Sequence, residues 1–324
     1  MPSGTEGEGV VMAVAMVTGA SRGLGRAVAG ELAARGWDLV LSARAAGLLA
    51  EAGAELRAAG ARVSVVAGDV SSAAHRAELV AAARALGGLD LLVNNAGVLG
   101  AEPLVPLAVH PLEGLREAFE VNVVAPLGLV QEALPLLRAA GAGAVLNISS
   151  DAAVVPYRTW GAYGATKAAG DLMSAVLAGE EPGLRVWWAD PGSMRTRMMA
   201  AAEPGEDLAG LPGPEEVAPL LLRLVAERLP SGRYTAEALA GAEQGGAEPA
   251  GVGQARAQQG EAEQAGAEQN RAAQNRAAQA EAGQGRAQQA GAEQAGAAQD
   301  RAAQAGAQQG GAAQDRVQQG GVGA

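Results

Sequence analysis

Residues 10–25, VVMAVAMVTGASRGLG, decide the fold because an apolar run leads directly into a glycine-rich turn. The run at 10–17 carries no charge and has the length of a buried β-strand. It is too short to cross a bilayer, which takes about 20 apolar residues. The Ala-rich residues 26–35 have a helical composition. A strand, a glycine turn and a helix in this order predict the first unit of a parallel α/β sheet.

The glycine turn also predicts an anion site. Gly19, Gly23 and Gly25 have the spacing G-x-x-x-G-x-G, which differs from the general dinucleotide spacing G-x-G-x-x-G. Glycines let the backbone approach a phosphate, and the free N–H groups at a helix N-terminus favour the negative charge. An ordinary glycine-rich turn is the alternative. The flanking strand and helix favour a phosphate cradle.

Residues 10–239 continue as an alternation of apolar runs and helical stretches. Strands are expected at 39–42, 62–67, 90–93, 144–148, 184–189 and 232–235, and helices at 47–59, 72–86 and 112–139. This alternation predicts a Rossmann-like, doubly wound parallel sheet of about seven strands with helices on both faces. Ligands of such sheets bind at the carboxyl ends of the strands, so polar residues there are site candidates.

The end of the second strand bears on the choice of cofactor. An acidic residue there would bind a ribose 2′-hydroxyl and repel a 2′-phosphate. The chain instead has Ser42, Ala43 and Arg44, with Arg22 in the glycine turn. Guanidinium groups bind phosphate through paired hydrogen bonds, so the pattern favours NADP(H) over NAD(H). The alternative is that both arginines are ordinary surface cations.

The only lysine of the chain, Lys167, follows Tyr163 by four residues. On a helix these two side chains share a face. A nearby cation lowers the pKa of a phenol from its usual value of about 10, which suits proton transfer near neutral pH. Ser150 can offer a hydroxyl to the same reacting oxygen. A Tyr/Lys pair at this spacing also occurs on solvated helix faces, and the pattern alone does not separate the two.

Asparagine is scarce in the first 240 residues, where it occurs at four positions only: Asn94, Asn95, Asn122 and Asn147. Asn122 lies inside the long helix expected at 112–139, although Asn is a mediocre helix former. Its amide therefore has a hydrogen-bonding task. A structural role and a catalytic role are equally compatible with its position.

A set of motifs occurs in order along residues 11–235. It comprises TGASRGLG at 18–25, Asp69, NNAG at 94–97, Asn122, Ser150, Tyr163 with Lys167, and Pro191 and Gly192 with Thr196. This set resembles the short-chain dehydrogenase/reductase family in its short, single-domain branch. The resemblance implies hydride transfer between a nicotinamide and a carbonyl or alcohol carbon of a small molecule. It also implies a homodimer or homotetramer formed through the long helices.

The resemblance also implies residue roles. Tyr163 would be the general acid/base, Lys167 would hold the nicotinamide ribose and lower the pKa of Tyr163, and Ser150 would bind the substrate oxygen. Asn122 would hold a water in a proton relay to Lys167. The residues implied in cofactor binding are Gly19, Ser21, Arg22, Gly23, Leu24, Gly25, Arg44, Asp69, Val70, Asn95, Ala96, Gly97, Tyr163, Lys167, Pro191, Gly192 and Thr196.

The expected activity is that of an NADP-dependent enzyme, most simply a carbonyl reductase. The alternative is a non-catalytic NADP-binding sensor or regulatory protein on the same fold, since fold alone does not fix function. The joint presence of Asn122, Ser150, Tyr163 and Lys167 favours the enzyme, because a sensor does not need all four.

Composition excludes several other classes. The net charge of −11 argues against binding a nucleic-acid backbone, and the absence of cysteine excludes thiolate chemistry and thiolate metal sites. His75 and His110 lie too far apart in sequence for a ligand motif and are interpreted as polar surface or loop residues. No metal, membrane or nucleic-acid partner is expected. The N-terminus lacks the basic start of a signal peptide, so a cytoplasmic protein is expected.

Several residues close in sequence to Tyr163 and to Thr196 carry a weaker functional signal. Met194, Met198 and Met199 can line a pocket, but Met at helical spacing is more often packing, and Tyr157 and Trp160 are interpreted in the same way. Asp190, just before Pro191 and Gly192, is an unusual acid at the expected cofactor mouth and has no assigned role.

The ends of the chain are predicted to differ from the domain at 10–239. Residues 1–9 are expected to be a flexible N-terminus, and residues 240–324 an Ala/Gln/Gly tail with Gln at the fifth position of 15 of 16 pentads. Without large apolar side chains such a tail cannot offset its ordering entropy, so disorder with transient helix is expected. An inert repeat expansion and a Gln/Ala-rich interaction tail are both open, and deletion of 241–324 would distinguish them.

Overall fold

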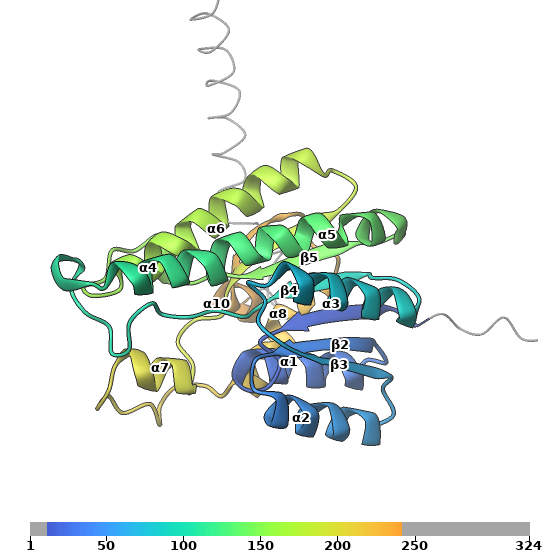
Figure 1. Ribbon diagram of the computed structural model, residues 1–324, viewed down its shortest axis with the longest axis horizontal. Helices are drawn as coiled ribbons and strands as arrows, with labels where there is room; N and C mark the ends of the chain where they lie inside the picture. Colours follow the sequence, from blue (N-terminus) through green and yellow to red (C-terminus); the bar gives the residue numbers. More distant parts are fainter. Residues whose placement is uncertain (1–11, 242–324) are drawn as a thin grey trace, which may run out of the picture. The chain divides into compact units, whose positions relative to one another are not determined.

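The computed structural model of the chain describes residues 12–241 (Figure 1). The expectations for residues 1–9 and for the tail from 242 onward lie outside the described residues. Ala240 and Gly241, which the sequence assigns to the tail, are the last residues of a helix, α10 (Ala236–Gly241).

Seven strands form one sheet in the order β3-β2-β1-β4-β5-β6-β7, and all six neighbouring pairs are parallel. The predicted doubly wound sheet is thereby confirmed, with strand ends that differ from the expected ones by one or a few residues. The strands are β1 (Val14–Thr18), β2 (Asp38–Ala43), β3 (Val63–Ala67), β4 (Leu91–Asn94), β5 (Ala144–Ile148), β6 (Arg185–Asp190) and β7 (Gly232–Thr235).

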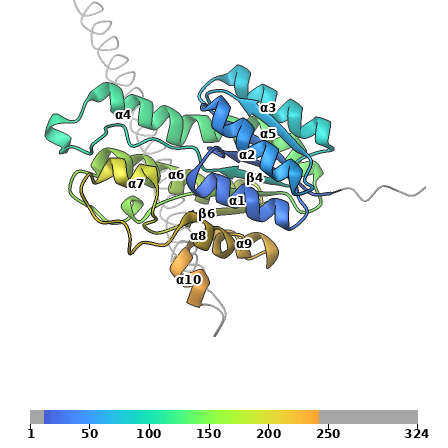
Figure 2. The ribbon, with the colours of Figure 1, turned by 90° about the horizontal axis from the view of Figure 1, so that it is seen from below.

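Alternate residues of the central strand β1 enter two separate cores. Ala15 and Val17 belong to one apolar cluster, whereas Val14 and Met16 belong to the other. Side chains of a strand point to opposite faces in turn, so each face of the sheet needs its own cover. Figures 1 and 2 show helices flanking the sheet. The first cluster is completed by α1 (Gly23–Ala34), α2 (Ala46–Ala58), α8 (Pro214–Leu221), α9 (Arg223–Ala226) and α10, and the second by α3 (Ala73–Leu86), α5 (Ala125–Ala139) and α6 (Gly161–Glu180).

The long helix expected at 112–139 is interrupted. It consists of α4 (Leu112–Phe119), a π-helical turn η2 (Glu120–Val124) and α5. Proline has no N–H, so Pro126 denies the main-chain carbonyl of Asn122 its usual α-helical partner four residues on. π-turns inside helices are frequent at functional sites. The interruption therefore falls on the asparagine that the sequence singles out.

The segment 112–139 is also the one part of the described chain that is long and apolar enough to cross a membrane by length and composition alone. This is weak support for a membrane span, because the core helix of a globular protein passes the same test. Leu129 and Leu137 of α5 are fully buried in the second core, as expected of a helix that covers a sheet.

Both histidines are buried. The expectation of polar surface or loop residues is wrong for His75, which lies in α3, whereas His110 does lie in a loop, directly after the 3₁₀ turn Leu107–Val109. His75 is 5% exposed, and its Nε2 lies 2.8 Å from the Ser42 hydroxyl. Gly68 makes room for it, since a Cβ there would lie 2.3 Å from His75 Nδ1. Burial lowers the pKa of His75. His110 is 8% exposed, and neither ring nitrogen has a hydrogen-bond partner in the described part of the chain.

The register brings the polar strand ends together at one edge of the sheet. Thr18 pairs with Ser42, Asn94 with Asn147, and Asp190 with Thr235. These residues lie at or near the carboxyl ends of their strands, the edge at which ligands of open α/β sheets bind.

Candidate active site

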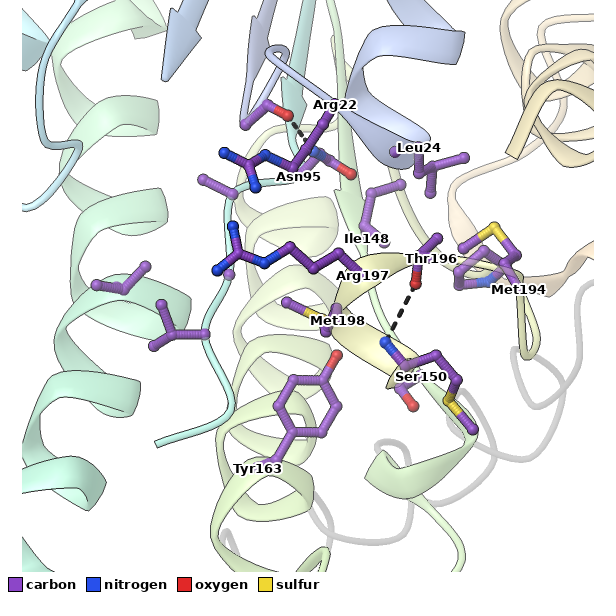
Figure 3. A pocket seen from close by; sticks show the side chains of 18 of the residues that line it. Arg22, Leu24, Asn95, Ile148, Ser150, Tyr163, Met194, Thr196, Arg197 and Met198 are labelled. Atoms are coloured by element: carbon purple, nitrogen blue, oxygen red, sulfur yellow. Dashed lines mark hydrogen bonds between the residues drawn. The ribbon is translucent and has the colours of Figure 1, made fainter. Parts of the chain in front are cut away.

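A cavity of about 650 Å³ opens at this edge of the sheet. It brings together nearly all of the residues that the sequence nominates, from the glycine turn, the ends of β2 to β6 and the start of α6 (Figure 3). Of the nominated residues, only Gly25 and Asn122 do not line it. Those that do are Gly19, Ser21, Arg22, Gly23, Leu24, Arg44, Asp69, Val70, Asn95, Ala96, Gly97, Ser150, Tyr163, Lys167, Pro191, Gly192 and Thr196.

The glycine turn is held so close to β4 that side chains do not fit. Gly19 has a φ of +69°, and a Cβ there would lie 2.7 Å from Asn95 Nδ2. A Cβ on Gly25 would lie 2.5 Å from the Gly19 carbonyl oxygen. Gly25 thus supports the turn from behind and does not line the cavity. The Arg22 side chain does not cap α1, and no acidic residue occupies the first helical turn. The helix N-terminus therefore keeps donors for an anion.

Thr18 and Asn95 fasten this turn to the end of β4. The Thr18 hydroxyl accepts hydrogen bonds from the main-chain N–H groups of Asn95 and Ala96, at 3.0 and 3.1 Å. In return, Asn95 Nδ2 donates to the Thr18 carbonyl at 2.9 Å. These bonds pre-organise the cradle. The residues present therefore fit the pyrophosphate of a dinucleotide.

Two arginines stand at the far end of the cradle. Arg44 is 61% exposed and lies 4.0 Å from Asp69 and 3.8 Å from Glu117. The Arg22 side chain is exposed, and its guanidinium forms no hydrogen bond or ion pair with any residue of the described range. The Asp69 carboxylate accepts from Ser71 N at 2.9 Å, and its pKa is lowered by the bonds from Ser71 and the charge of Arg44 against the cost of burial.

Tyr163 lies on the first turn of α6, is 7% exposed and points its hydroxyl into the cavity (Figure 3). Trp160 packs edge-on against its ring, with centroids 5.6 Å apart. Burial raises the pKa of Tyr163, and the charges of Asp190 and Asp151 raise it further. The sequence-based expectation that this pKa is lowered is therefore wrong.

Lys167 explains the discrepancy. Its Nζ donates a hydrogen bond of 2.7 Å to the Ile148 carbonyl at the end of β5 and lies over the Tyr163 ring, 5.4 Å from the centroid. Burial lowers the pKa of Lys167 itself to about 8. The cation is thus directed to the main chain, and its attraction does not offset the burial of the phenol. The shared helix face was predicted correctly, but the electrostatic consequence was not.

The two serines at the end of β5 have separate partners. The Ser149 hydroxyl donates to the Asp171 carboxylate. Ser150 lies at the cavity, where its hydroxyl donates to Asp151 Oδ1 at 3.0 Å and accepts from Ala152 N at 3.2 Å. Ser150 is the N-terminal residue before a short 3₁₀ turn, η3 (Asp151–Ala153). Both serines line the cavity, and each donates its hydroxyl hydrogen to a different carboxylate.

Asn122 lies behind the cavity, in the π-turn η2. Its amide bonds Val98 N, Val98 O and Thr166 Oγ1, each at 2.9 Å, which is the structural role left open by the sequence. A second, smaller cavity of about 60 Å³ is lined by Asn122, Lys167 and Asn94. Asn94 Oδ1 is buried without a partner in the described part of the chain. This space is polar and has room for water.

Arg233 of β7, which sequence reasoning did not single out, connects the site to the far side of the sheet. It donates to Asp171 Oδ2 at 3.0 Å and to the Ser150 carbonyl at 2.9 Å. It also lies 3.8 Å from Asp190 Oδ2. Burial raises the pKa of Asp171 and of Asp190, and Arg233 opposes both shifts.

Replacement of Arg233 by Gln is expected to destabilise the protein. Removing one member of a buried charge pair leaves the other uncompensated, which costs about 3 kcal/mol. A fall in kcat is also expected, because the Ser150 main chain loses an anchor. Chemical denaturation and steady-state kinetics would measure both.

The matched control for this prediction is Arg116→Gln, because Arg116 pairs with Glu113 on an exposed surface, where both side chains are more than two-thirds exposed. That variant should lose about 0.5 kcal/mol or less. Equal losses in the two variants would contradict the importance given to Arg233.

The cavity wall includes residues that the sequence analysis interprets as packing residues. Met194, Met198, Met199, Tyr157 and Trp160 all line it. The signal that could have revealed the two aromatics is their place between Ser150 and Tyr163 in the sequence. Four acidic side chains were not nominated either, and they also line the cavity: Glu102, Asp151, Asp190 and Glu203. Within residues 12–241, no group of three or more His, Asp or Glu residues could hold a metal ion.

A glycine cradle at the carboxyl edge of a parallel sheet, facing a buried tyrosine and a lysine, defines a dinucleotide-binding oxidoreductase of the Rossmann class. The family follows from comparison with known proteins. A family model described as short chain dehydrogenase matches residues 13–207. The chain belongs to this family and is an enzyme, an oxidoreductase.

Relatives and solved structures agree with this membership. Sepiapterin reductase of Mus musculus is 37% identical over 209 residues, which is 61% of this chain and 80% of that protein. The cis-4-hydroxycyclohexanecarboxylate dehydrogenase of Sinomonas cyclohexanicum is 35% identical over 235 residues, covering 68% and 92%. The structure of a short chain dehydrogenase of Shigella flexneri complexed with NADP superposes with a TM-score of 0.66 at 30% identity, covering 70% of this chain and 98% of that one.

Proposed function

We propose that this protein is an NADP(H)-dependent carbonyl reductase that acts on a small molecule. The observation that carries the proposal is the position of the Tyr163 hydroxyl. The side chain is 7% exposed, and its hydroxyl points into the cavity that Ser150 and Lys167 also line. A buried hydroxyl directed at a ligand space is suited to deliver a proton.

The cofactor part of the proposal rests on the cradle and the two arginines. Arg22 and Arg44 offer guanidinium donors where a 2′-phosphate would lie, and no carboxylate follows β2 directly. The complex of the Shigella flexneri relative with NADP supports the same cofactor. When bound, NADPH supplies the hydride for the carbonyl carbon. Preference for NADP(H) over NAD(H) belongs to the proposal.

The residues of the chain supply position and a proton. Ser150 donates its hydroxyl hydrogen to the substrate oxygen, and Tyr163 delivers the proton to that oxygen. Lys167 holds its ammonium beside the Tyr163 ring and favours the transient phenolate. The cavity of about 60 Å³ that Lys167 shares with Asn122 supports a water-filled path by which Tyr163 is reprotonated.

The decisive experiment measures oxidation of NADPH and NADH by the full chain with a panel of ketones, aldehydes and diketones. Turnover with NADPH on at least one carbonyl compound is the expected result. Tight NADPH binding without turnover on a broad panel would favour the sensor. Failure to bind either cofactor would overturn the proposal.

Loss of Arg22 and Arg44 together is expected to reverse the cofactor preference. In Arg22→Gln/Arg44→Gln, the KM for NADPH should rise by about 10- to 100-fold, because charge-assisted hydrogen bonds contribute about 1.5–3 kcal/mol, and the KM for NADH should change little. Arg22 alone should matter more than Arg44, which is partly neutralised by Asp69 and Glu117. Kinetics with both cofactors would measure this.

Arg26→Gln is the matched control for the cofactor variants, because Arg26 lies on α1, the helix that begins directly after Arg22, pairs with Glu55 and does not line the cavity. Its KM values should stay near those of the parent protein. A double variant that still prefers NADPH to the same extent would remove the role given to the two arginines.

We further propose that residues 10–239 form the oxidoreductase domain and that the protein acts in the cytoplasm, without nucleic-acid, metal or membrane partners. A homodimer or homotetramer through the long helices is supported by exposed apolar side chains on them, among which Leu172 of α6 is 68% exposed and Leu127 of α5 is 39% exposed. Sedimentation analysis would test the assembly.

A further inference from the structure

The substrate end of the cavity is acidic. Asp151 lies directly beside the reacting groups, with Oδ1 3.0 Å from Ser150 Oγ and Oδ2 2.9 Å from the Tyr157 hydroxyl. Asp190, only 6% exposed, ends β6 at the same cavity. Both carboxylates raise the pKa of Tyr163, so their negative potential reaches the hydroxyl that points into the cavity. A ligand oxygen at Tyr163 is therefore approached from a negatively charged wall.

The cations near this wall are engaged elsewhere. Lys167 Nζ bonds the Ile148 carbonyl, and Arg233 bonds Asp171 and the Ser150 carbonyl, which leaves it 3.8 Å from Asp190. Arg197, at the start of α7 (Arg197–Ala202), extends away from Ser150 toward the side of the cavity where Arg22 lies (Figure 3). Within residues 12–241, Asp151 forms no ion pair closer than 4.0 Å.

Aromatic side chains complete the wall. Tyr157 is 44% exposed and donates its hydroxyl hydrogen to Asp151, and Trp160 donates from Nε1 to Glu203 Oε1 at 3.1 Å. Each ring is thus paired with a carboxylate, and both line the cavity. Aromatic faces attract cations, and more strongly where the cation is desolvated. The combination of rings and carboxylates matches a ligand with a positive charge.

We propose that the substrate is an amino ketone whose ammonium group, on the carbon next to the carbonyl, binds Asp151. This assignment rests on the proposed reductase function. A carbonyl oxygen held by Ser150 and Tyr163 places its α-substituent near Asp151, because Ser150 Oγ and Asp151 Oδ1 are 3.0 Å apart. The carbonyl carbon gains the hydride, the oxygen gains the Tyr163 proton, and NADPH becomes NADP⁺. The product is an amino alcohol.

The contact between Ser150 and Asp151 gives this recognition a catalytic consequence. The Ser150 hydroxyl donates its hydrogen to Asp151 Oδ1. An ammonium group supplies new donors to that carboxylate and releases the Ser150 hydrogen for the substrate oxygen. A neutral ketone must compete with Asp151 for it, and an anionic ketone is repelled as well.

Three phenyl ketones of nearly equal size test the proposal at about pH 6.5, where the amine is protonated. They are 2-amino-1-phenylethanone, the neutral propiophenone and the anionic 3-oxo-3-phenylpropanoate. With NADPH and the full chain, kcat/KM for the amino ketone should exceed that for propiophenone by about tenfold or more, with the anion lowest. Asp151→Asn should bring the first two to within about threefold of each other. Glu206→Gln, which removes an exposed carboxylate outside the cavity wall, should keep the preference.

Equal kcat/KM values for the three ketones would overturn the assignment while leaving the reductase function intact. If none of the ketones turns over, the reductase proposal fails for this class, and binding still decides recognition. Calorimetry of the NADP⁺ complex would then compare 2-amino-1-phenylethanol with 1-phenylpropan-1-ol. A preference for the amino alcohol that Asp151→Asn removes supports the ammonium site, and no preference overturns it.

Discussion

Replacement of Tyr163 by Phe is expected to lower kcat by about 10³-fold, within the 10²- to 10⁴-fold range of general acid catalysis. The hydroxyl belongs to a buried side chain and points into the cavity, where it can deliver a proton to a ligand oxygen. Because the ring stays, its packing against Trp160 is kept and the fold should be unaffected. Stopped-flow measurement of NADPH oxidation with an active carbonyl compound would measure the loss.

Two comparisons separate a catalytic loss from other causes. NADPH affinity should fall by no more than about tenfold, the worth of one hydrogen bond. Tyr234→Phe is the matched control, because Tyr234 is also buried, but its hydroxyl donates to the Pro230 carbonyl at 2.9 Å, away from the cavity. That variant should keep its kcat. A Tyr163→Phe protein that retains a tenth of the parent kcat would rule out Tyr163 as the general acid.

The glycine turn shows why most of the cofactor cradle could be predicted from sequence. The close approach between Gly19, Gly25 and Asn95 is a property of backbone geometry that few residue types permit. The residue types at 18–25 and 94–97 therefore predict the close approach of the glycine turn to Asn95. Strand ends could be predicted for a similar reason, because parallel strands place their carboxyl ends at one edge and the polar residues there are few.

Electrostatic properties could not be predicted in the same way. The spacing of Tyr163 and Lys167 fixes a shared helix face, but the pKa of the phenol depends on burial and on Asp151 and Asp190, which come from other segments. Arg233 is a similar case. It lies 83 residues from Ser150 in the sequence, and only the order β5-β6-β7 brings the two together. Charge networks across strands leave no local pattern.

Asn122 shows an intermediate case. The scarcity of asparagine and the position of Asn122 inside a predicted helix indicate that its amide forms specific hydrogen bonds. They leave a structural role and a catalytic role equally open. The structure shows that the amide is used to hold Val98 and Thr166, while the π-turn and the small cavity beside Lys167 involve the same residue. Pro126, four residues later, was the available signal for the π-turn. The Asn122 side chain thus stabilises the fold through its hydrogen bonds, and the same residue also lies in the π-turn and lines the small cavity next to Lys167.

Lys167→Met is expected to make the protein more stable and nearly inactive. Burial lowers the pKa of Lys167 to about 8, below the usual lysine value of about 10.4, so the folded protein holds this proton less tightly than the unfolded chain. Below about pH 8 the folded state therefore carries the full cost, about 3 kcal/mol, of burying the ammonium. Methionine removes that cost but also the bond to Ile148, so a net gain of about 1–2 kcal/mol at pH 7 is expected.

The pH dependence distinguishes this explanation from better packing by methionine. As the pH rises from about 8 to about 10.4, the unfolded chain still binds the proton that the folded protein has lost, so parent stability rises and the advantage of Lys167→Met shrinks. Denaturation at pH 7 and near pH 10 would measure the difference. A variant less stable than the parent at pH 7, or an advantage unchanged near pH 10, would contradict a strained ammonium. Lys167→Arg, which keeps a larger and permanent charge, should instead be destabilised. If the buried lysine costs stability, its benefit must lie in the rate of catalysis. Lys167→Met should accordingly lower kcat by about 10²-fold or more.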